Sequence, residues 1–309
     1  MKEEEKIINR MGTTIKLKVQ AENAHHILQV AENMLIDFEQ RFNANDENSQ
    51  LMKLAKNAGE KVTVLDQDLY ELIKIGKRHS DDPDSFLNIT LGPLIKAWNI
   101  GFLDAQMPKQ EIITEKLQLS NPKKILLDDA KQSVLLKEKG MSIDLGALAK
   151  GYFADKIIHF FKQEGAVSGF IDLGGNVLTF GEASHTGDDF WKVGIQNPFL
   201  PRGNQAMILK IKNQSVVTSG IYERVLVDND QKYHHIFDRK TGYPVATDLV
   251  SLTIVSKLSL DGEIWTTRLF GHNISKILET VSQDDSLEAI LMTKNGELAY
   301  TKGIKNRLV

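Results

Sequence analysis

Segments with strand periodicity and segments with helix periodicity follow one another in this chain without a regular strand–helix–strand repeat. Residues 13–19 (TTIKLKV) alternate apolar and polar side chains, as a half-buried strand does, and residues 249–256 (LVSLTIVS) alternate again. Residues 22–40 instead carry apolar side chains at helical spacing. A hairpin is predicted around Asn295-Gly296, the strongest short turn signal in the chain. This order predicts an α+β fold with mixed or antiparallel sheets and packed helices, rather than a doubly wound parallel sheet.

Capping residues mark the expected ends of several helices. Ser49 precedes a short helix predicted over about 50–57, and Asp66 is the expected N-cap of the next helix. A long helix is predicted from Gly146 to Gly165, where glycine suits the position after a helix end. Strands of a meander are predicted near 125–143.

Composition excludes several functional classes. The net charge of −3 gives no electrostatic argument for binding nucleic acid or an anionic membrane surface. The absence of cysteine removes disulfides, thiolate metal sites and cysteine nucleophiles. The 309 residues contain no repeat, low-complexity tract or flexible linker. We therefore expect a single domain over 1–309, with any two subdomains packed together and interleaved in sequence.

The N-terminal residues and the lengths of the apolar runs indicate the cellular location of the protein. The first nineteen residues contain no apolar core of a signal peptide and no cysteine for lipidation. No apolar run approaches the ~20 residues of a membrane-spanning helix. The sequence as it stands predicts a cytoplasmic protein without a membrane span, although an exported lipoprotein without its leader would look the same.

Three glycine-containing stretches offer backbone groups to a ligand. In IDLGALAKGYFAD, residues 143–155, a strand is expected to end at Asp144 before a turn and a helix. Free N–H groups at a helix start suit a phosphate, and Lys150 lies on the first turn. The same residues also fit a plain strand-to-helix turn. IDLGGNV (171–177) and VVTSGIYER (216–224) are, taken alone, equally typical of tight turns.

Two further stretches carry side chains with acid–base or ligand chemistry. YHHIFDRKTGYP (233–244) contains two adjacent histidines, which on a strand point to opposite faces, and Asp238 could orient a ring or bind a cation. In DGEIWTTRLFG, Glu263 and Thr267 share a helix face, and their hard oxygens suit Mg²⁺. A polar surface hairpin and an ordinary capped helix are the alternatives. Together the five stretches supply the groups that handle a pyrophosphate.

In their order, these motifs resemble the ApbE family of FAD:protein FMN transferases. The resemblance covers nearly the whole chain, through the motifs MGTTIKL, LNITLGPLIKAWNIGF, IDLGALAKGYFAD, IDLGGNV, WKVGIQNP, VVTSGIYER, YHHIFDRKTGYP and TTRLFG. It implies two intimate subdomains with FAD in the cleft between them. It also implies a Mg²⁺-dependent transfer of FMN from FAD to a Thr or Ser hydroxyl of a target flavoprotein. AMP is released, and the product carries a phosphodiester-linked flavin, a post-translational modification.

The resemblance further implies roles for individual residues. His235 is expected to accept the proton of the acceptor hydroxyl. The backbone carbonyl of Ala147 and the side chains of Glu263 and Thr267 are expected to bind Mg²⁺. The residues expected to bind FAD are Met11, Asn45, Trp98, Asn99, Ile100, Asp144, Lys150, Ser219, Gly220 and Ile236.

The metal motif departs from the family pattern, which is Asp, three residues, then Thr. Glu263 occupies the Asp position, whereas Asp261 is six residues from Thr267, so either acid is a candidate ligand. Two other functions fit the same motifs. One is an FAD pyrophosphatase, which uses water as acceptor and releases FMN and AMP. The other is a flavin-binding protein without turnover.

Overall fold

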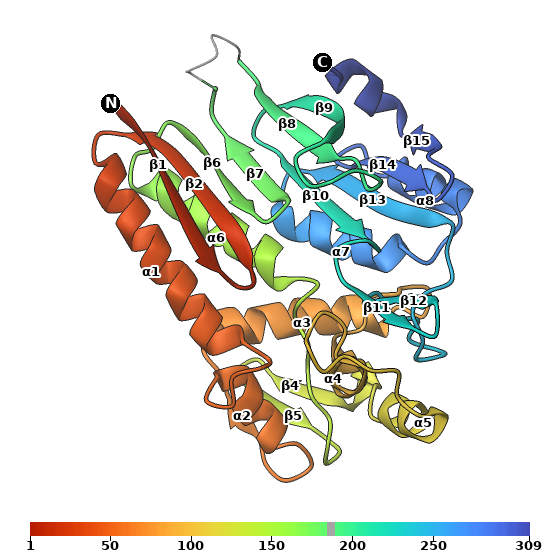
Figure 1. Cartoon of the computed structure of the whole chain (residues 1–309). Helices are drawn as coiled ribbons and strands as arrows, with labels where there is room; N and C mark the ends of the chain where they lie inside the picture. The colour runs from red at the N-terminus through yellow and green to blue at the C-terminus, as the bar shows by residue number, and fades with distance from the viewer. Residues whose placement is uncertain (184–188) are drawn as a thin grey trace.

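The structure is a computed structural model that describes residues 1–183 and 189–309. Within these residues, its largest element is an eight-stranded sheet of order β1-β2-β6-β7-β10-β13-β14-β15, in which every neighbouring pair is antiparallel (Figure 1). The strands are β1 Lys2–Arg10, β2 Thr13–Ala21, β6 Ser168–Leu173, β7 Asn176–Phe180, β10 Ser215–Gly220, β13 Leu249–Ser256, β14 Glu288–Thr293 and β15 Leu298–Tyr300. The predicted α+β class with antiparallel sheet is confirmed.

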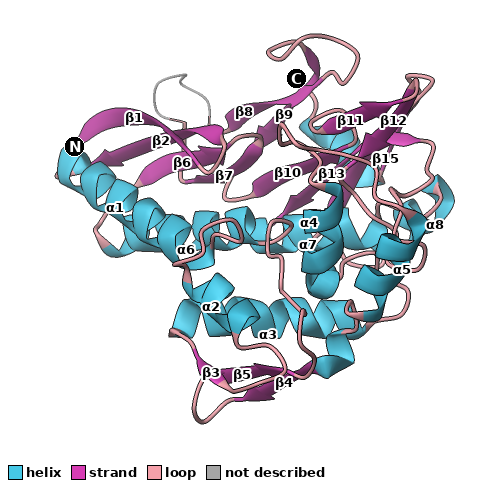
Figure 2. Cartoon of the chain, turned by 60° about the horizontal axis from the view of Figure 1, so that its bottom comes forward, coloured by secondary structure: helices cyan, strands magenta, loops and turns pink. Residues whose placement is uncertain are grey.

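Helices cover one face of this sheet, and a smaller layer follows beneath them (Figure 2). The helices of the first layer are α1 Ala24–Phe42, α6 Ala149–Gln163, α7 Ser259–Leu269 and α8 Ile274–Val281. The smaller layer contains α2 Gln50–Lys56, α3 Gln67–Asp81, α4 Gly92–Trp98, α5 Gln110–Gln118 and a sheet of β3 Thr63–Val64, β5 Ser133–Leu136 and β4 Ile125–Asp128. Two hairpins complete the fold, β8 Trp191–Gln196 with β9 Gln205–Ile211 and β11 Val225–Asp228 with β12 Gln231–His234.

The hydrophobic core is continuous between the large sheet and the smaller layer. One cluster of buried side chains includes Leu17 of β2, Phe153 of α6, Leu54 of α2, Leu69 of α3 and Val134 of β5. Burial of such side chains is the main favourable term in folding. The two layers are therefore joined by shared apolar packing rather than by a polar seam. None of the helices in the described part of the chain is long and apolar enough to cross a membrane.

The predicted caps and the hairpin are present. The Ser49 hydroxyl accepts a hydrogen bond from the backbone N–H of Met52 at 3.0 Å, and the Asp66 carboxylate accepts one from Leu69 at 3.0 Å. Each satisfies a free N–H group in the first turn of its helix. Gly296 has a φ of +81° in the turn between β14 and β15, a conformation that glycine adopts without strain.

Two sequence predictions differ from the structure, and one strand was not predicted. All eight residues of β13 are buried, because α7 and α8 cover one face of this strand and the β8–β9 hairpin covers the other. Its alternation therefore does not mark a solvent face. Residues 141–145 form no strand, so the meander predicted near 125–143 is limited to the β4–β5 hairpin. The first strand, β1, was not predicted, because its charged side chains hide its pairing with β2.

Gly151 allows α6 and α7 to approach each other closely. A Cβ atom at this position would lie 2.6 Å from the carbonyl oxygen of Ser259 and 2.7 Å from Cγ of Glu263. We expect Gly151→Ala to lower the free energy of unfolding by about 1–3 kcal/mol, because the two helices must separate to admit the methyl group. Urea denaturation measures this change. An unchanged midpoint would show that the helices are not packed this tightly.

Candidate active site

Three chemically active side chains from distant parts of the sequence lie within electrostatic reach of one another. The Lys150 ammonium, on the first turn of α6, lowers the pKa of both Glu263 on α7 and His235 after β12, although burial has the larger effect on each pKa. The charge of Lys150 therefore acts on both an acid and a base. This trio is the centre of the candidate site.

Glu263 is a buried acid with a defined set of partners. Glu263 is only 5% exposed, and this burial raises the pKa of its carboxyl group above the usual value. Lys150, the side-chain amide of Asn176 and the backbone N–H of Gly151 act in the opposite direction. Asn176 Nδ2 donates to Oε1 of Glu263 at 2.8 Å. In turn, the Ser259 hydroxyl donates to the Asn176 side-chain oxygen.

The start of α7 is fixed by an acid from α6. The two carboxylate oxygens of Asp155 accept hydrogen bonds from the backbone N–H groups of Ser259 and Leu260 at 2.8 and 2.9 Å. Burial raises the pKa of Asp155 to about 6, although these N–H groups favour the charged form. Asp155 therefore caps a helix that begins 104 residues later and carries Glu263. Asp155 ends the motif IDLGALAKGYFAD, but no role was predicted for it.

Asp261, the other candidate acid, has different neighbours. Burial raises its pKa, Asp284 adds to this effect and Arg78 opposes it. Lys150 does not figure among these influences, whereas it acts directly on Glu263. Of the two acids, Glu263 is the one whose charge is coupled to the lysine.

Glu263 and the oxygens expected to join it would fit a hard divalent cation. Thr267 is half-buried and lies one turn after Glu263 on α7, and Ala147 lies just before α6. Within the described residues, no cluster of three or more His, Asp or Glu side chains could hold a metal ion. A metal at Glu263 would thus have one carboxylate with hydroxyl and carbonyl oxygens. This set suits Mg²⁺, which keeps waters and substrate phosphates as its other ligands.

The adjacent histidines have separate environments, but they are not neighbours on one strand as predicted, because β12 ends at His234 and His235 lies in the bend that follows. His234 is buried, with Nε2 3.0 Å from the carbonyl oxygen of Val245 and with Nδ1 accepting from the N–H of Ile236 at 3.2 Å. His234 is thus fixed within the fold. His235 is half-buried, and its Nδ1 lies 3.4 Å from the carbonyl oxygen of Arg224. Donation from Nδ1–H to this carbonyl leaves Nε2 with a free lone pair.

We expect the imidazole of His235 to remain neutral down to about pH 5. Burial and the nearby cations Arg224 and Lys150 lower the pKa of His235 to about 4. Since an unfolded histidine titrates near ~6.5, the unfolded state binds the extra proton first, and this group lowers stability as the pH falls from ~6.5 towards 4. An NMR titration of the ring protons, assigned with His235→Ala, measures the midpoint. A midpoint near 6.5 would contradict this environment.

Asp238 and Arg239 hold the histidine loop in place. Asp238 Oδ1 accepts from the N–H of Lys240 at 2.7 Å, so this acid stabilises the turn and is not a partner of the His235 ring. Arg239 Nη1 donates to the carbonyl oxygens of Ser80, Asp82 and Ser85 at 2.7, 3.1 and 3.3 Å. The end of α3 and the residues that follow it therefore anchor this loop. Arg268 of α7 is anchored to the same segment, by hydrogen bonds to Asp82 and His79.

Arg224 is a charged neighbour that the sequence analysis did not select. It is exposed, and its charge acts on both Asp144 and His235. Its stem packs against Gly101, where a Cβ atom would lie 2.8 Å from Cδ of Arg224. The sequence signal was present, because Arg224 ends the stretch VVTSGIYER.

Among the residues expected to bind FAD, Trp98 lies in a hydrophobic core. Its side chain has no exposed surface, its Nε1 donates to the carbonyl oxygen of Gly242 at 3.0 Å, and its ring packs against Tyr233 and Phe237. The following residue, Asn99, has a φ of +49° at the end of α4, and its Nδ2 donates to Asp104 at 2.6 Å. Ile100 is buried in the same core.

Other expected FAD-binding residues lie on strand β10 and in loops from distant parts of the sequence. Met11 lies in the turn between β1 and β2, where its N–H donates to Glu39 at 2.9 Å, and Asn45 is exposed after α1. Ser219 and Gly220 are the last residues of β10. Ile236 packs beside the cluster that lies between β13, α7 and α8.

Asp144 is held before α6, where its carboxylate accepts the N–H of Gly146 at 2.8 Å. Its backbone N–H donates to the carbonyl oxygen of Ile89 at 2.9 Å. Burial raises the pKa of Asp144, and both the Gly146 N–H and the Arg224 charge oppose this effect.

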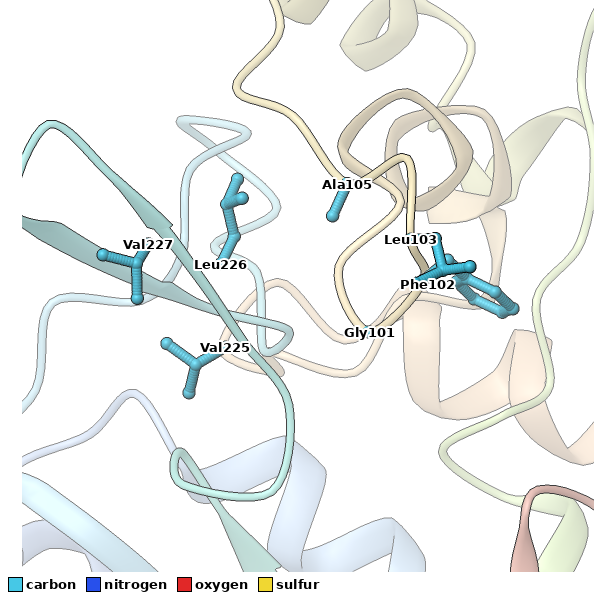
Figure 3. Close-up of a pocket in the computed structure, with 7 residues that line it drawn as sticks. All are labelled: Gly101, Phe102, Leu103, Ala105, Val225, Leu226 and Val227. Atoms are coloured by element: carbon cyan, nitrogen blue, oxygen red, sulfur yellow. The ribbon is translucent and has the colours of Figure 1, made fainter.

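A surface hollow of about 560 Å³ lies beside Arg224 (Figure 3). One wall is the loop after Asn99, and the other is strand β11. Its lining residues are Gly101, Phe102, Leu103, Ala105, Val225, Leu226 and Val227. The side chains shown are apolar, so the hollow offers hydrophobic contacts close to the charged groups of the site.

The fold and the site together define an α+β protein in which the charge of a lysine at a helix start acts on a buried acid and on a histidine with a lowered pKa. The ApbE family matches residues 11–291, and the chain belongs to this family. This confirms the family that the motifs indicated.

Known relatives and solved structures support the same grouping. The chain is 37% identical over 290 residues to the FAD:protein FMN transferase of Klebsiella pneumoniae, with 93% of this chain and 88% of the relative covered. It is 30% identical over 313 residues to that of Treponema pallidum, with 96% and 86% covered. The crystal structure of the ApbE protein of Thermotoga maritima superposes with a TM-score of 0.90 at 26% identity and covers 99% of both chains.

Proposed function

We propose that this chain is an FAD:protein FMN transferase, which moves FMN from FAD to a Thr or Ser hydroxyl of a target flavoprotein. The membership of the ApbE family and the full-length relatives named for this activity support the assignment. The observation that carries the mechanism is that Lys150 is electrostatically coupled to both Glu263 and His235. We also propose that residues 1–309 form one flavin transferase domain with two interleaved subdomains.

In the proposed reaction the acceptor hydroxyl attacks the FMN-side phosphorus of the FAD pyrophosphate. The new bond joins the acceptor oxygen to this phosphorus, and the bond from phosphorus to the bridging oxygen breaks. AMP leaves with the bridging oxygen and its electron pair. His235 accepts the hydroxyl proton, for which its neutral state at pH 7 is required.

Positive charge around the pyrophosphate is the second part of the mechanism. Lys150, with the N–H groups at the start of α6, would neutralise the phosphate oxygens. Arg224 is close enough to His235 to contribute. Glu263, Thr267 and the carbonyl of Ala147 would hold Mg²⁺, which when bound offsets the charge that develops on the departing phosphate.

The apolar hollow beside Arg224 is proposed to receive an aromatic ring system of FAD. Asn99 and Ile100 begin the loop that forms one wall of this hollow. Trp98 would support this loop from the hydrophobic core. Asp144, Ser219, Gly220 and Ile236, with Met11 and Asn45, remain the proposed further FAD-binding residues.

Mass spectrometry of a candidate flavoprotein tests this function. The protein, FAD and Mg²⁺ are incubated with the candidate, and one peptide is expected to gain the mass of FMN while AMP appears in equal amount. The same incubation without acceptor separates the alternatives. Rapid formation of free FMN and AMP would favour the pyrophosphatase, and FAD that stays intact under all conditions would favour binding without turnover.

A further inference from the structure

A buried amide, Asn176, connects the large sheet to the proposed metal-binding acid. Asn176 is the first residue of β7 and is 2% exposed. Its Nδ2 donates to Oε1 of Glu263 at 2.8 Å across 87 residues of sequence. Its Oδ1 accepts from the hydroxyl of Ser259, the first residue of α7.

The carboxylate of Glu263 fixes which way the amide points. An ionised carboxylate can only accept, whereas a serine hydroxyl can donate or accept. The NH₂ group therefore faces Glu263, and Oδ1 accepts the proton of the Ser259 hydroxyl. The amide is therefore set as a donor to the carboxylate, and its orientation does not depend on solvent.

A glutamate in this position has more need of such a partner than an aspartate. Its extra methylene adds a rotatable bond, and the entropy lost on fixing a glutamate side chain is among the largest of any residue. A hydrogen bond from a buried amide to a carboxylate is charge-assisted and directional. It engages Oε1, and a carboxylate has about four lone-pair sites on its two oxygens, so the bonds from Asn176 and Gly151 leave lone pairs for a cation.

We propose that Asn176 is a positioning residue that holds the Glu263 carboxylate in one orientation, with lone pairs free for a divalent cation. This inference rests on the proposed function, because it assigns Glu263 to the metal site. Ser259 acts one step further out by donating to the amide oxygen. Residues that contact a metal-binding side chain, and not the metal itself, typically change the affinity for the metal by about 10–100-fold.

Metal binding measured without turnover provides the main test. Electron paramagnetic resonance follows the binding of Mn²⁺ alone to the parent and to Asn176→Ala and Asn176→Asp. We expect the dissociation constant to rise about 10–100-fold in both variants. Ser259→Ala is expected to give a smaller rise in the dissociation constant, because the Asn176 amide stays but its oxygen loses its hydrogen-bond partner. The Mg²⁺ concentration for half-maximal transfer should shift in the same order.

Ser215→Ala is the matched control for folding. Ser215 is buried in the same sheet, and its hydroxyl donates to the carbonyl oxygen of Val177 at 3.0 Å. Its loss removes a buried hydrogen bond without touching Glu263, so Mn²⁺ affinity should stay at the parent value. Thermal denaturation of all variants identifies any that fail to fold. If the Asn176 variants do not fold, Ser259→Ala still tests the proposal, because Ser259 bonds to Asn176 and not to Glu263.

The outcomes separate the inference from the function on which it rests. If Asn176→Ala, Asn176→Asp and Ser259→Ala bind Mn²⁺ as the parent does, the inference is overturned and the proposed function stands. If the parent does not bind Mn²⁺ but transfers FMN without any divalent cation, the proposed metal site is wrong and the inference falls with it.

Discussion

His235→Ala is expected to leave FAD binding nearly unchanged and to lower the rate of FMN transfer by about 10²–10⁴-fold, the usual contribution of a general base. The imidazole has the required state, since its environment lowers the pKa of His235 to about 4 and keeps the ring neutral at pH 7. It also lies within reach of Arg224 and Lys150, the cations expected around the pyrophosphate. The loss should therefore appear in the chemical step.

Two measurements distinguish this result from a folding defect. Equilibrium binding of FAD to the variant should match the parent, whereas single-turnover transfer to an acceptor should be slow. His159→Ala, on the exposed side of α6, is the matched control and should behave as the parent does. A variant at position 235 that transfers FMN at the parent rate would remove the histidine from the mechanism.

Glu263→Gln is expected to raise the Mg²⁺ requirement sharply and to lower transfer by about 10²-fold or more at fixed Mg²⁺. A bound divalent ion supplies several kcal/mol of charge stabilisation, and about 1.4 kcal/mol corresponds to a factor of ten in rate. Glutamine retains an oxygen that can accept from Asn176 Nδ2, so the buried amide keeps a partner. The substitution removes the charge and preserves the shape.

Asp261→Asn is the matched comparison, because it neutralises the other acid on α7 in an equally conservative way. Asp261 is influenced by Asp284 and Arg78, and not by Lys150, so its neutralisation should change the Mg²⁺ requirement little. Titration of transfer activity with Mg²⁺ gives both values in one assay. The opposite ranking of the two variants would assign the metal to Asp261.

Local sequence signals predicted much of the fold. Ser49, Asp66 and Asn295-Gly296 were identified because a cap or a tight turn is determined by side chains a few residues away. The same logic failed at β13, where alternation on a strand buried on both faces is indistinguishable from alternation on an exposed one. The strand β1 was missed because its pairing with β2, not its composition, makes it a strand.

The candidate site was predicted only as far as residue types and motif order allow. His235, Lys150 and Glu263 were selected from three separate stretches, and the order of the motifs gave the family. The roles of Asp155, Asn176 and Arg224 were not predicted, because each depends on a partner that lies elsewhere in the sequence. Asp155 caps α7 across 104 residues, and Asn176 reaches Glu263 across 87 residues.

The sequence by itself determined most of the helices and strands, two helix caps, the family and the chemical groups available, since these depend on near neighbours and on motif order. Only the tertiary structure decided which acid is coupled to Lys150, which histidine is fixed in the interior and which amide holds Glu263. The physical reason is that pKa values and buried hydrogen bonds depend on distances in space. The packing of α6 against α7 at Gly151 sets those distances.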